Sequence, residues 1–294
     1  MKIAVPDLIS PSYFPVIAAV EMGFLHAELE LLYPVTKTYE ELRAGRLDFV
    51  GGAAHAALYA FPEWQGGKLL CALARHMYWF LVVRSDLKAR KGNLRVVKGL
   101  RIGAAPGPVD GLKRMLQAAG VDPAREVQIG PVPGVLETAS FGLMAARALE
   151  EGKLDGFWAN GMGAEVAVRS GVGTLVLDVR RDGPEEAKGY TFPALVTTEK
   201  LIREKPEAAR AAIKAIIAAQ EALKGDPNRA TDVARKHFPP TETALIAELV
   251  RRDAPFYEAG ISPGTVESMN RFARDIGLLS RPVAHQQVVA RIAA

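Results

Sequence analysis

Short apolar runs that end at glycine or proline alternate with stretches of helical period along the first part of the chain. The apolar runs are short enough to be buried strands, and the stretches between them repeat their apolar positions every three to four residues. Ser10 or Ser12 is the expected N-cap of the first helix. The pattern predicts strands at residues 2–6, 29–35, 49–52, 69–74 and 78–83, and helices that end at residues 22, 44 and 60.

The middle of the chain repeats the same alternation after a polar segment at residues 85–99. A loop at 180–189, dense in charge and glycine, precedes a run at 190–196 that we expect to be a strand returning to the first lobe. Everything after residue 198 has a helical period, broken only at proline and glycine. Strands are predicted at residues 101–105, 127–132, 156–159 and 174–179, and helices at 109–119, 138–151 and 164–170.

One phrase occurs twice, as Leu42-Arg-Ala-Gly-Arg-Leu-Asp48 and as Leu149-Glu-Glu-Gly-Lys-Leu-Asp155. Gly45 and Gly152 each stand where a helix ends in a residue that tolerates positive φ, and each is followed by a cation near the negative end of the helix dipole. An apolar strand follows both copies. The echo predicts two lobes of like construction.

The predicted fold class is therefore α/β, with two lobes and a helical C-terminal region packed on lobe one. Lobe one is expected to comprise residues 1–84 and 194–294, and lobe two residues 85–193. Such lobes bind ligands at the carboxyl ends of their strands, in the cleft between them. Hinges are expected near Val83–Ser85 and Tyr190–Pro193, so that the lobes move as rigid bodies.

Composition and charge limit the classes of function that the protein could have. The 294 residues include 37 basic and 33 acidic side chains, scattered through the sequence, and the net charge of +4 indicates no nucleic-acid partner. The single cysteine, Cys71, lies in an apolar run and is expected in the core. No apolar run is long enough to span a membrane.

The start of the sequence leaves the location open. It passes directly into a predicted strand, with no apolar segment of the kind that begins a secretory signal. The protein is expected to be periplasmic if a signal peptide has been removed, and cytoplasmic if the given start is native.

Patterns for catalysis or cofactor binding are few. The sequence contains no Gly-x-Ser-x-Gly, His-Glu-x-x-His, Cys-x-x-Cys or Walker motif. Gly161-Met-Gly163 resembles the start of a dinucleotide fingerprint but lacks the third glycine. The five histidines show no metal-ligand spacing. No metal and no cofactor are expected.

The candidate binding residues follow predicted strands. Small residues and hydroxyls there would let an anionic group approach a helix N-terminus, although Gly52 and Ala53 can equally serve helix–strand packing. Arg75 and His76 could add a cation, or form a surface turn. In lobe one the candidates are Ser10, Ser12, Tyr13, Gly52, Ala53, His55, Arg75 and His76.

Matching positions in lobe two supply the remaining candidates. Trp158 and Phe192 could stack on a ligand, or be core residues as strand aromatics usually are. Asn160 lies between alanine and glycine, where it either contacts a ligand or turns the chain. The full set is Gly107, Pro108, Trp158, Asn160 and Gly161, with Tyr190 and Phe192 on the returning segment.

Several segments, in this order, resemble one known family. They include residues 14–25, the phrase Leu42-x-x-Gly-x-x-Asp48, Val97-Lys-Gly-Leu-Arg-Ile-Gly103, Ala119-Gly-Val-Asp-Pro123 and Glu204-Lys-Pro-Glu207. The chain is similar, over nearly its whole length, to the type II substrate-binding proteins of ABC transporters, in the group that handles sulfonates, nitrate and thiamine pyrimidine precursors.

The resemblance implies a monomeric solute-binding protein that passes a small anionic ligand to an ABC permease in the membrane. We expect the anionic group near Ser10, Ser12 and Gly52, with Arg75 as a nearby cation. An enzymatic branch of the family implies an alternative, in which His55 is the general base for a small carboxylate or pyrimidine precursor. The cysteine-rich segment of that branch is absent, and no lysine lies between Asp48 and His55. A cytosolic sensor that uses the same cleft is a third possibility.

Overall fold

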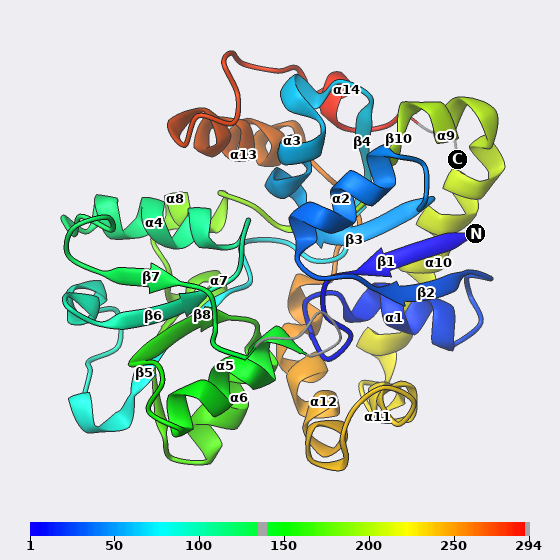
Figure 1. The fold of residues 1–294 in the computed structure, drawn as a ribbon. Helices are drawn as coiled ribbons and strands as arrows, with labels where there is room; N and C mark the ends of the chain where they lie inside the picture. Colours follow the sequence, from blue (N-terminus) through cyan, green and yellow to red (C-terminus); the bar gives the residue numbers. More distant parts are fainter. Residues whose placement is uncertain (135–139, 292–294) are drawn as a thin grey trace. The chain divides into compact units, whose positions relative to one another are not determined.

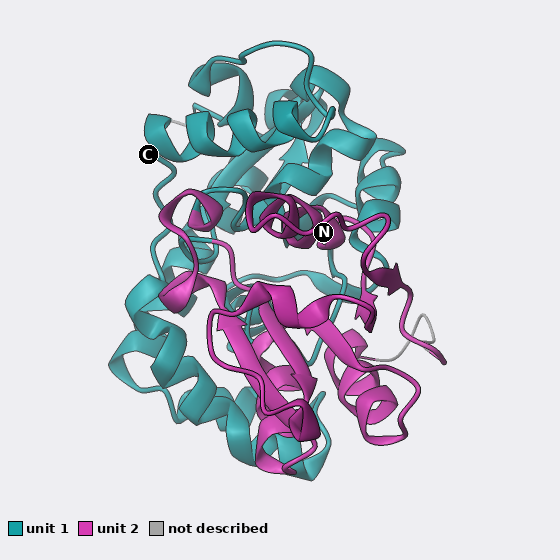
Figure 2. Cartoon of the chain, turned by 90° about the vertical axis from the view of Figure 1, so that its left-hand side faces the viewer, with its two compact units in different colours: residues 1–76, 189–294 teal, residues 77–188 magenta. Residues whose placement is uncertain are grey.

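The computed structural model describes residues 1–134 and 140–291, which fall into two compact units. Unit 1 comprises residues 1–76 and 189–294 and unit 2 comprises 77–188, so the chain passes between them twice (Figure 2). A hydrogen bond joins the first and last residues of unit 2, because the Met77 N–H donates to the Lys188 carbonyl at 2.9 Å. Within the described ranges, no helix is long and apolar enough to cross a membrane.

The sheet of unit 1 has the order β2-β1-β3-β10-β4, with β10 antiparallel to both of its neighbours. Strands β1 and β3 are fully buried except at Lys2, so their near-continuous apolar runs are those of a sheet covered on both faces. The strands are β1 (Lys2–Val5), β2 (Glu28–Leu31), β3 (Phe49–Ala53), β4 (Gly67–Ala72) and β10 (Pro193–Thr198).

Helices cover both faces of this sheet, with α1 and α10 on one side and α2 on the other (Figure 1). The C-terminal helices belong to unit 1 and pack on it, because α10 contacts α1 and β4 while α14 contacts β4. The helices are α1 (Phe14–Glu21), α2 (Val35–Arg43), α3 (Ala57–Ala60), α9 (Glu199–Glu204), α10 (Pro206–Gly225), α11 (Arg229–Ala234), α12 (Pro240–Asp253), α13 (Pro263–Asp275) and α14 (His285–Val288).

Unit 2 holds a second sheet, of order β7-β6-β8-β5-β9, with α4 on one face and α5 and α6 on the other (Figure 1). Its strands are β5 (Phe80–Arg84), β6 (Arg101–Ala104), β7 (Gln128–Gly130), β8 (Gly156–Ala159) and β9 (Gly173–Asp178). Its helices are α4 (Val109–Ala118), α5 (Phe141–Glu150), α6 (Gly161–Arg169), α7 (Val179–Asp182) and α8 (Glu185–Lys188). The first residues of the helix predicted at 138–151 lie outside the described residues.

The two units follow one plan. In each sheet three parallel strands, of order second-first-third in the chain, are followed by one antiparallel strand and then by a strand parallel to the first three. The antiparallel strand is β10 in unit 1 and β5 in unit 2. Each is the first strand after the chain has crossed from the other unit. The predicted duplication is therefore a structural one.

The repeated sequence phrase closes the same hydrogen-bonded ring in both units. In unit 1 the Lys2 N–H donates to Asp48 Oδ2 at 2.8 Å, and the Asp48 N–H donates to the Lys2 carbonyl at 2.9 Å. In unit 2 Arg101 and Asp155 make the same two bonds, at 3.0 and 2.9 Å. Each ring joins the start of the third strand to the start of the first, which explains why the aspartate ends both copies of the phrase.

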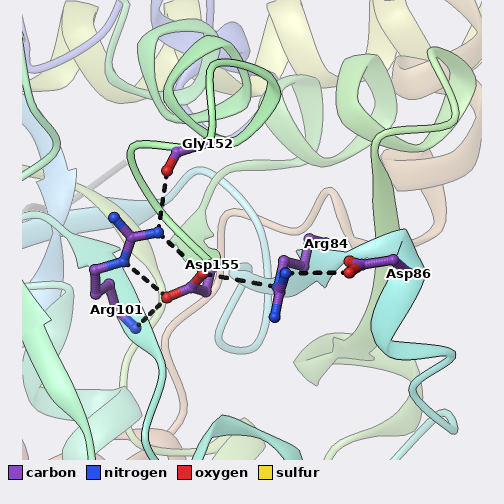
Figure 3. A network of polar contacts seen from close by, with 5 residues as sticks. All are labelled: Arg84, Asp86, Arg101, Gly152 and Asp155. Carbon is purple, nitrogen blue, oxygen red and sulfur yellow. Dashed lines mark hydrogen bonds and ion pairs between the residues drawn. The ribbon is translucent and has the colours of Figure 1, made fainter.

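Arginines reinforce the ring of unit 2 (Figure 3). The Arg101 guanidinium donates to both oxygens of Asp155 and to the Gly152 carbonyl, and Arg84 lies on the other side with its Nε 3.7 Å from Asp155 Oδ1. Hydrogen bonding from Arg101 lowers the pKa of Asp155 to about 2. Gly152 itself has φ of +68°, as its predicted place after a helix requires.

The first crossing lies earlier in the chain than predicted. Strand β5 pairs with β8 and β9 in unit 2, so the run expected to be the last strand of lobe one belongs to the second sheet. The chain leaves unit 1 at residues 76–77 rather than 84–85, and it returns at 188–189 rather than 193–194. An apolar strand buried on both faces has the same composition in either sheet, so its pattern does not reveal its partners.

Candidate functional site

The carboxyl edge of the sheet in unit 1 brings together the candidates from that unit. Strands β1 and β3 are parallel and end at Val5 and Ala53, while β10 starts opposite Ala53 because Pro193 is paired with it. Strand β4 also ends at this edge. Four segments therefore meet there, namely residues 6–13, 53–55, 73–76 and 190–193.

The segment after β1 is folded by its own side chains. The Ser12 N–H donates to Ser10 Oγ at 3.2 Å, and the Phe14 N–H donates to the Pro11 carbonyl at 3.4 Å. Helix α1 begins at Phe14, with Tyr13 as its N-cap and no side-chain cap bond. Neither serine caps this helix, contrary to the prediction, because the turn that precedes the helix uses Ser10.

Gly52 serves packing. A Cβ at Gly52 would lie 2.6 Å from the Tyr39 hydroxyl and 2.9 Å from a methyl group of Val35, both on α2. The Tyr39 hydroxyl donates to the Ala53 carbonyl at 2.9 Å. Of the two interpretations of Gly52 and Ala53, the geometry therefore favours close packing of a helix on the strand.

His55 lies in a buried polar and aromatic cluster. Its Nδ1 is 2.9 Å from Thr191 Oγ1, which also accepts the His55 N–H at 3.3 Å. The Thr191 hydroxyl therefore fixes the orientation of the imidazole. The ring makes an edge contact with Phe272 of α13, at a centroid distance of 5.4 Å.

The aromatic residues of the returning segment belong to the core. The Tyr190 ring stacks on the ring of Phe272, which also contacts His55, with the Tyr190 and Phe272 centroids 4.6 Å apart. Phe192 is fully buried, and its carbonyl accepts the Ala54 N–H at 2.9 Å. Stacking of these two rings on a ligand is therefore less well supported than packing.

Arg75 and His76 form a surface turn, the second of the two interpretations given for them. Arg75 is exposed, its Nε lies 3.0 Å from Glu258 Oε2, and its N–H donates to the Phe256 carbonyl. His76 has φ of +66° and an edge contact with Phe256. The expectation that Arg75 is the cation of the site is not supported, since a surface carboxylate already accompanies it.

In unit 2 the equivalent edge carries Gly107 and Pro108 after β6 and Asn160 and Gly161 after β8. Gly107 has φ of +82°, which favours glycine in this turn. The Trp158 indole N–H donates to the Pro108 carbonyl at 2.9 Å, and the side chain is fully buried. Trp158 therefore holds the turn after β6 in place and is a core residue.

Asn160 is the N-cap of α6. Its Oδ1 accepts from the N–H groups of Met162 and Gly163 at 3.0 and 3.2 Å. The cap explains why α6 begins at Gly161, three residues earlier than predicted. It also occupies the donors that a bound anion would use at this helix N-terminus.

Sequence reasoning missed two charged residues at these edges. Asp7 is 3% exposed, follows β1, and contributes to raising the pKa of Tyr33 to about 12, mainly an effect of burial. Arg180 is 4% exposed and follows β9, the strand parallel to β8. Arg180 falls in the segment predicted to be a charged loop, and nothing in that composition distinguishes a buried arginine from a solvated one.

Two features of the described side chains bear on catalysis. In the parts of the chain that the structure describes, no group of three or more histidines, cysteines or acids could hold a metal ion. Cys71 lies in β4, and burial raises the pKa of its thiol to about 12. A thiol with this pKa is almost entirely protonated at neutral pH and does not act as a nucleophile.

Comparison with known families identifies the group to which the sequence belongs. Residues 85–236, just over half of the chain, match the NMT1-like family. The chain belongs to the NMT1-like family. This finding confirms the resemblance drawn from the sequence. None of the curated proteins compared with this NMT1-like protein matches it in sequence.

Solved structures share the fold of this NMT1-like protein over nearly its whole length. A protein of Bordetella bronchiseptica RB50 is 19% identical, with a TM-score of 0.78 over 99% of this chain and 94% of the other. The alkanesulfonate-binding protein SsuA from Xanthomonas axonopodis pv. citri is 13% identical, with a TM-score of 0.76 over 98% and 97%. A mutant of the desulfurization enzyme DszB, in complex with biphenyl-2-sulfinic acid, is 16% identical, with a TM-score of 0.67 over 98% and 96%.

Because all three identities are low, these likenesses establish the fold alone. The predicted class, a two-lobed α/β binding-protein fold with helices on lobe one, is confirmed. The same fold occurs in a binding protein and in an enzyme, so function depends on the edge residues.

Proposed function

We propose that the protein is the solute-binding component of an ABC-type importer and that it captures a small organic anion. The observation that carries the proposal is the common plan of the two units, each of which presents the same sheet edge with loops after its first and third strands. Open α/β sheets bind ligands at this edge. The fold of an alkanesulfonate-binding protein supports the same function.

Several of the candidate residues at these edges have structural roles. Ser10, Gly52 and Asn160 each have a structural role in a turn, a packing contact or a helix cap. Such residues shape a rigid edge, which lowers the entropic cost of ordering a ligand site.

We further propose that the protein acts as a monomer outside the cytoplasmic membrane, where it would deliver its ligand to a permease. A cytosolic sensor is the competing proposal. Fractionation of the native host distinguishes them. Recovery from the periplasm or the membrane surface supports transport, and recovery in the cytosol supports a sensor.

A thermal-shift screen tests the binding proposal. The panel contains butanesulfonate, benzenesulfonate, benzoate, nitrate and the uncharged partners butanol and benzamide. A binder present at about 100 times its dissociation constant adds roughly 2.7 kcal/mol to the free energy of unfolding. We expect at least one sulfonate or carboxylate to stabilise the protein and its uncharged partner not to do so. Stabilisation by the uncharged compounds alone would contradict the proposal.

A second proposal is an enzyme of this fold, in which His55 is the general base for a small carboxylate or pyrimidine precursor. Two observations favour it: Thr191 orients the His55 imidazole, and DszB shares the fold. The test is prolonged incubation with each stabilising acid, followed by mass spectrometry. A product that His55→Gln fails to form would support the enzyme, whereas recovery of unchanged acid supports binding.

A further inference from the structure

Arg180 occupies the carboxyl edge of the sheet in unit 2. Asp178, the last residue of β9, pairs with Phe80, and Phe80 also pairs with Ala159, the residue before Asn160. Arg180 follows two residues later, in the first turn of α7, and is 4% exposed. The buried Arg180 therefore follows β9, and Asn160, the cap of α6, follows β8. Both strands pair with β5.

One oxygen of each carboxylate in the same turn lies on another cation. Asp178 Oδ2 accepts from Arg181 Nη1 at 2.8 Å, and Asp182 Oδ2 lies 2.8 Å from Lys91 Nζ. Arg180 has interactions within the chain, so binding of an acid would require ligand oxygens to replace or join them. A buried arginine is well suited to bind such oxygens, because its planar fork matches two oxygens of a carboxylate or sulfonate.

Helix N-termini at this edge are poor alternatives for an anion. At α6 the Met162 and Gly163 N–H groups already donate to Asn160 Oδ1. At α4 the Val109 N–H donates to the Ala105 carbonyl, and Asp110 places a carboxylate in the first turn. A carboxylate at that position already benefits from the helix dipole and repels a second anion.

We propose that Arg180 supplies the principal counter-charge for the acid group of the ligand, which is a carboxylate or sulfonate that offers two oxygens to one guanidinium. This inference rests on the proposed function and replaces the expected role of the donors near Ser10, Ser12 and Gly52 as the main anion site.

The test compares Arg180→Gln and Arg180→Lys with Arg181→Gln as the matched control. Arg181 is the adjacent cation, and its side chain is 28% exposed. Calorimetric titration uses benzoate, its uncharged partner benzamide, and butanesulfonate as the sulfonate probe, on the full chain. Circular dichroism and the melting temperature establish that each variant is folded.

We expect Arg180→Gln to weaken binding of the preferred acid by at least about 30-fold, because it removes one partner of a buried charge pair. Arg180→Lys keeps the charge but loses the fork, so its loss should be smaller, and Arg181→Gln should stay within about threefold of the unsubstituted protein. Affinity for benzamide should not fall with affinity for benzoate. A merely structural role for Arg180 would weaken both compounds alike, or unfold the Gln variant while the Lys variant binds normally.

Two outcomes separate this inference from the proposed function. If the unsubstituted protein binds an acid and Arg180→Gln binds it equally well, Arg180 is not the counter-charge although the protein still binds anions. If the unsubstituted protein binds none of the probes, the proposed function fails, and the role of Arg180 fails with it.

Discussion

At the scale of single residues, the candidates drawn from sequence lie at the expected strand ends, but most of them stabilise the fold. Trp158 and Phe192 are buried, Asn160 caps a helix, and Gly52 allows α2 to pack on β3. A strand end that faces a ligand and one that faces a helix have similar small residues, so composition alone could not separate the two roles. Arg180 was missed because burial of a charge depends on its tertiary surroundings.

Gly52→Ala should destabilise the protein. The new methyl group would lie 2.6 Å from the Tyr39 hydroxyl, so α2 must shift or the bond from that hydroxyl to the Ala53 carbonyl must break. Overpacking of this kind costs about 1–3 kcal/mol. Urea denaturation measures the loss. The control is Gly225→Ala at the end of α10, where a Cβ meets nothing within 4 Å and the expected change is below about 0.5 kcal/mol. Equal effects of the two substitutions would contradict the packing role of Gly52.

At the scale of elements, the hydrophobic period located most strands and helices, and the breaks predicted at residues 225–227, 239–240 and 262–263 are confirmed. The break at Lys205, between α9 and α10, was not predicted. The observed boundaries of elements differ from the predicted ones where the sequence did not reveal a cap or a turn. Helix α6 starts early because Asn160 caps it, and α1 starts at Phe14 because Ser10 is used in the turn before it. The repeated phrase was the strongest signal, because its aspartate makes the same backbone bonds in both units.

The ring of Asp155 predicts a pH dependence of stability. Its pKa is about 2 in the folded chain, below the value of about 3.9 for an unfolded aspartate, so its contribution is complete above the unfolded value and is lost as the pH falls from about 5 to 2. The full shift corresponds to about 2.5 kcal/mol. Because the Arg84 and Arg101 side chains are 44% and 45% exposed, solvent screening reduces the expected contribution to about 1 kcal/mol.

Asp155→Asn should therefore lower the free energy of unfolding at pH 7 by about 1 kcal/mol and flatten its fall between pH 5 and 2. Chemical denaturation at a series of pH values measures both effects. The control is Asp86→Asn, which removes the carboxylate that pairs with Arg84 at the surface and should change stability by less than about 0.5 kcal/mol. An unchanged pH profile for Asp155→Asn would show that the ring does not stabilise the fold.

At the scale of the whole molecule, the sequence predicted two lobes and a discontinuous first lobe, but it did not place the crossings. The pairing of β5 decides the first crossing, and its apolar residues would suit either sheet. Which sheet a strand joins depends on its contacts with residues far away in the sequence. A periodic pattern along one segment contains no such information.

The two covalent crossings at residues 76–77 and 188–189 predict that the units move as rigid bodies when a ligand binds. Small-angle scattering should show a smaller radius of gyration with a saturating acid from the thermal-shift panel than without it. The uncharged partner of that acid, at the same concentration, is the control. Unchanged dimensions at saturation would contradict closure on the ligand.

The central claim is that the protein binds an organic acid and releases it unchanged. Calorimetric titration of the full chain with butanesulfonate and benzoate, followed by mass spectrometry of the recovered compound, tests the claim most directly. The protein is expected to bind at least one acid saturably, one molecule per chain, with the acid recovered intact and its uncharged partner bound at least about 30-fold more weakly. Recovery of a transformed compound, or equal binding of the acid and its uncharged partner, would contradict the claim.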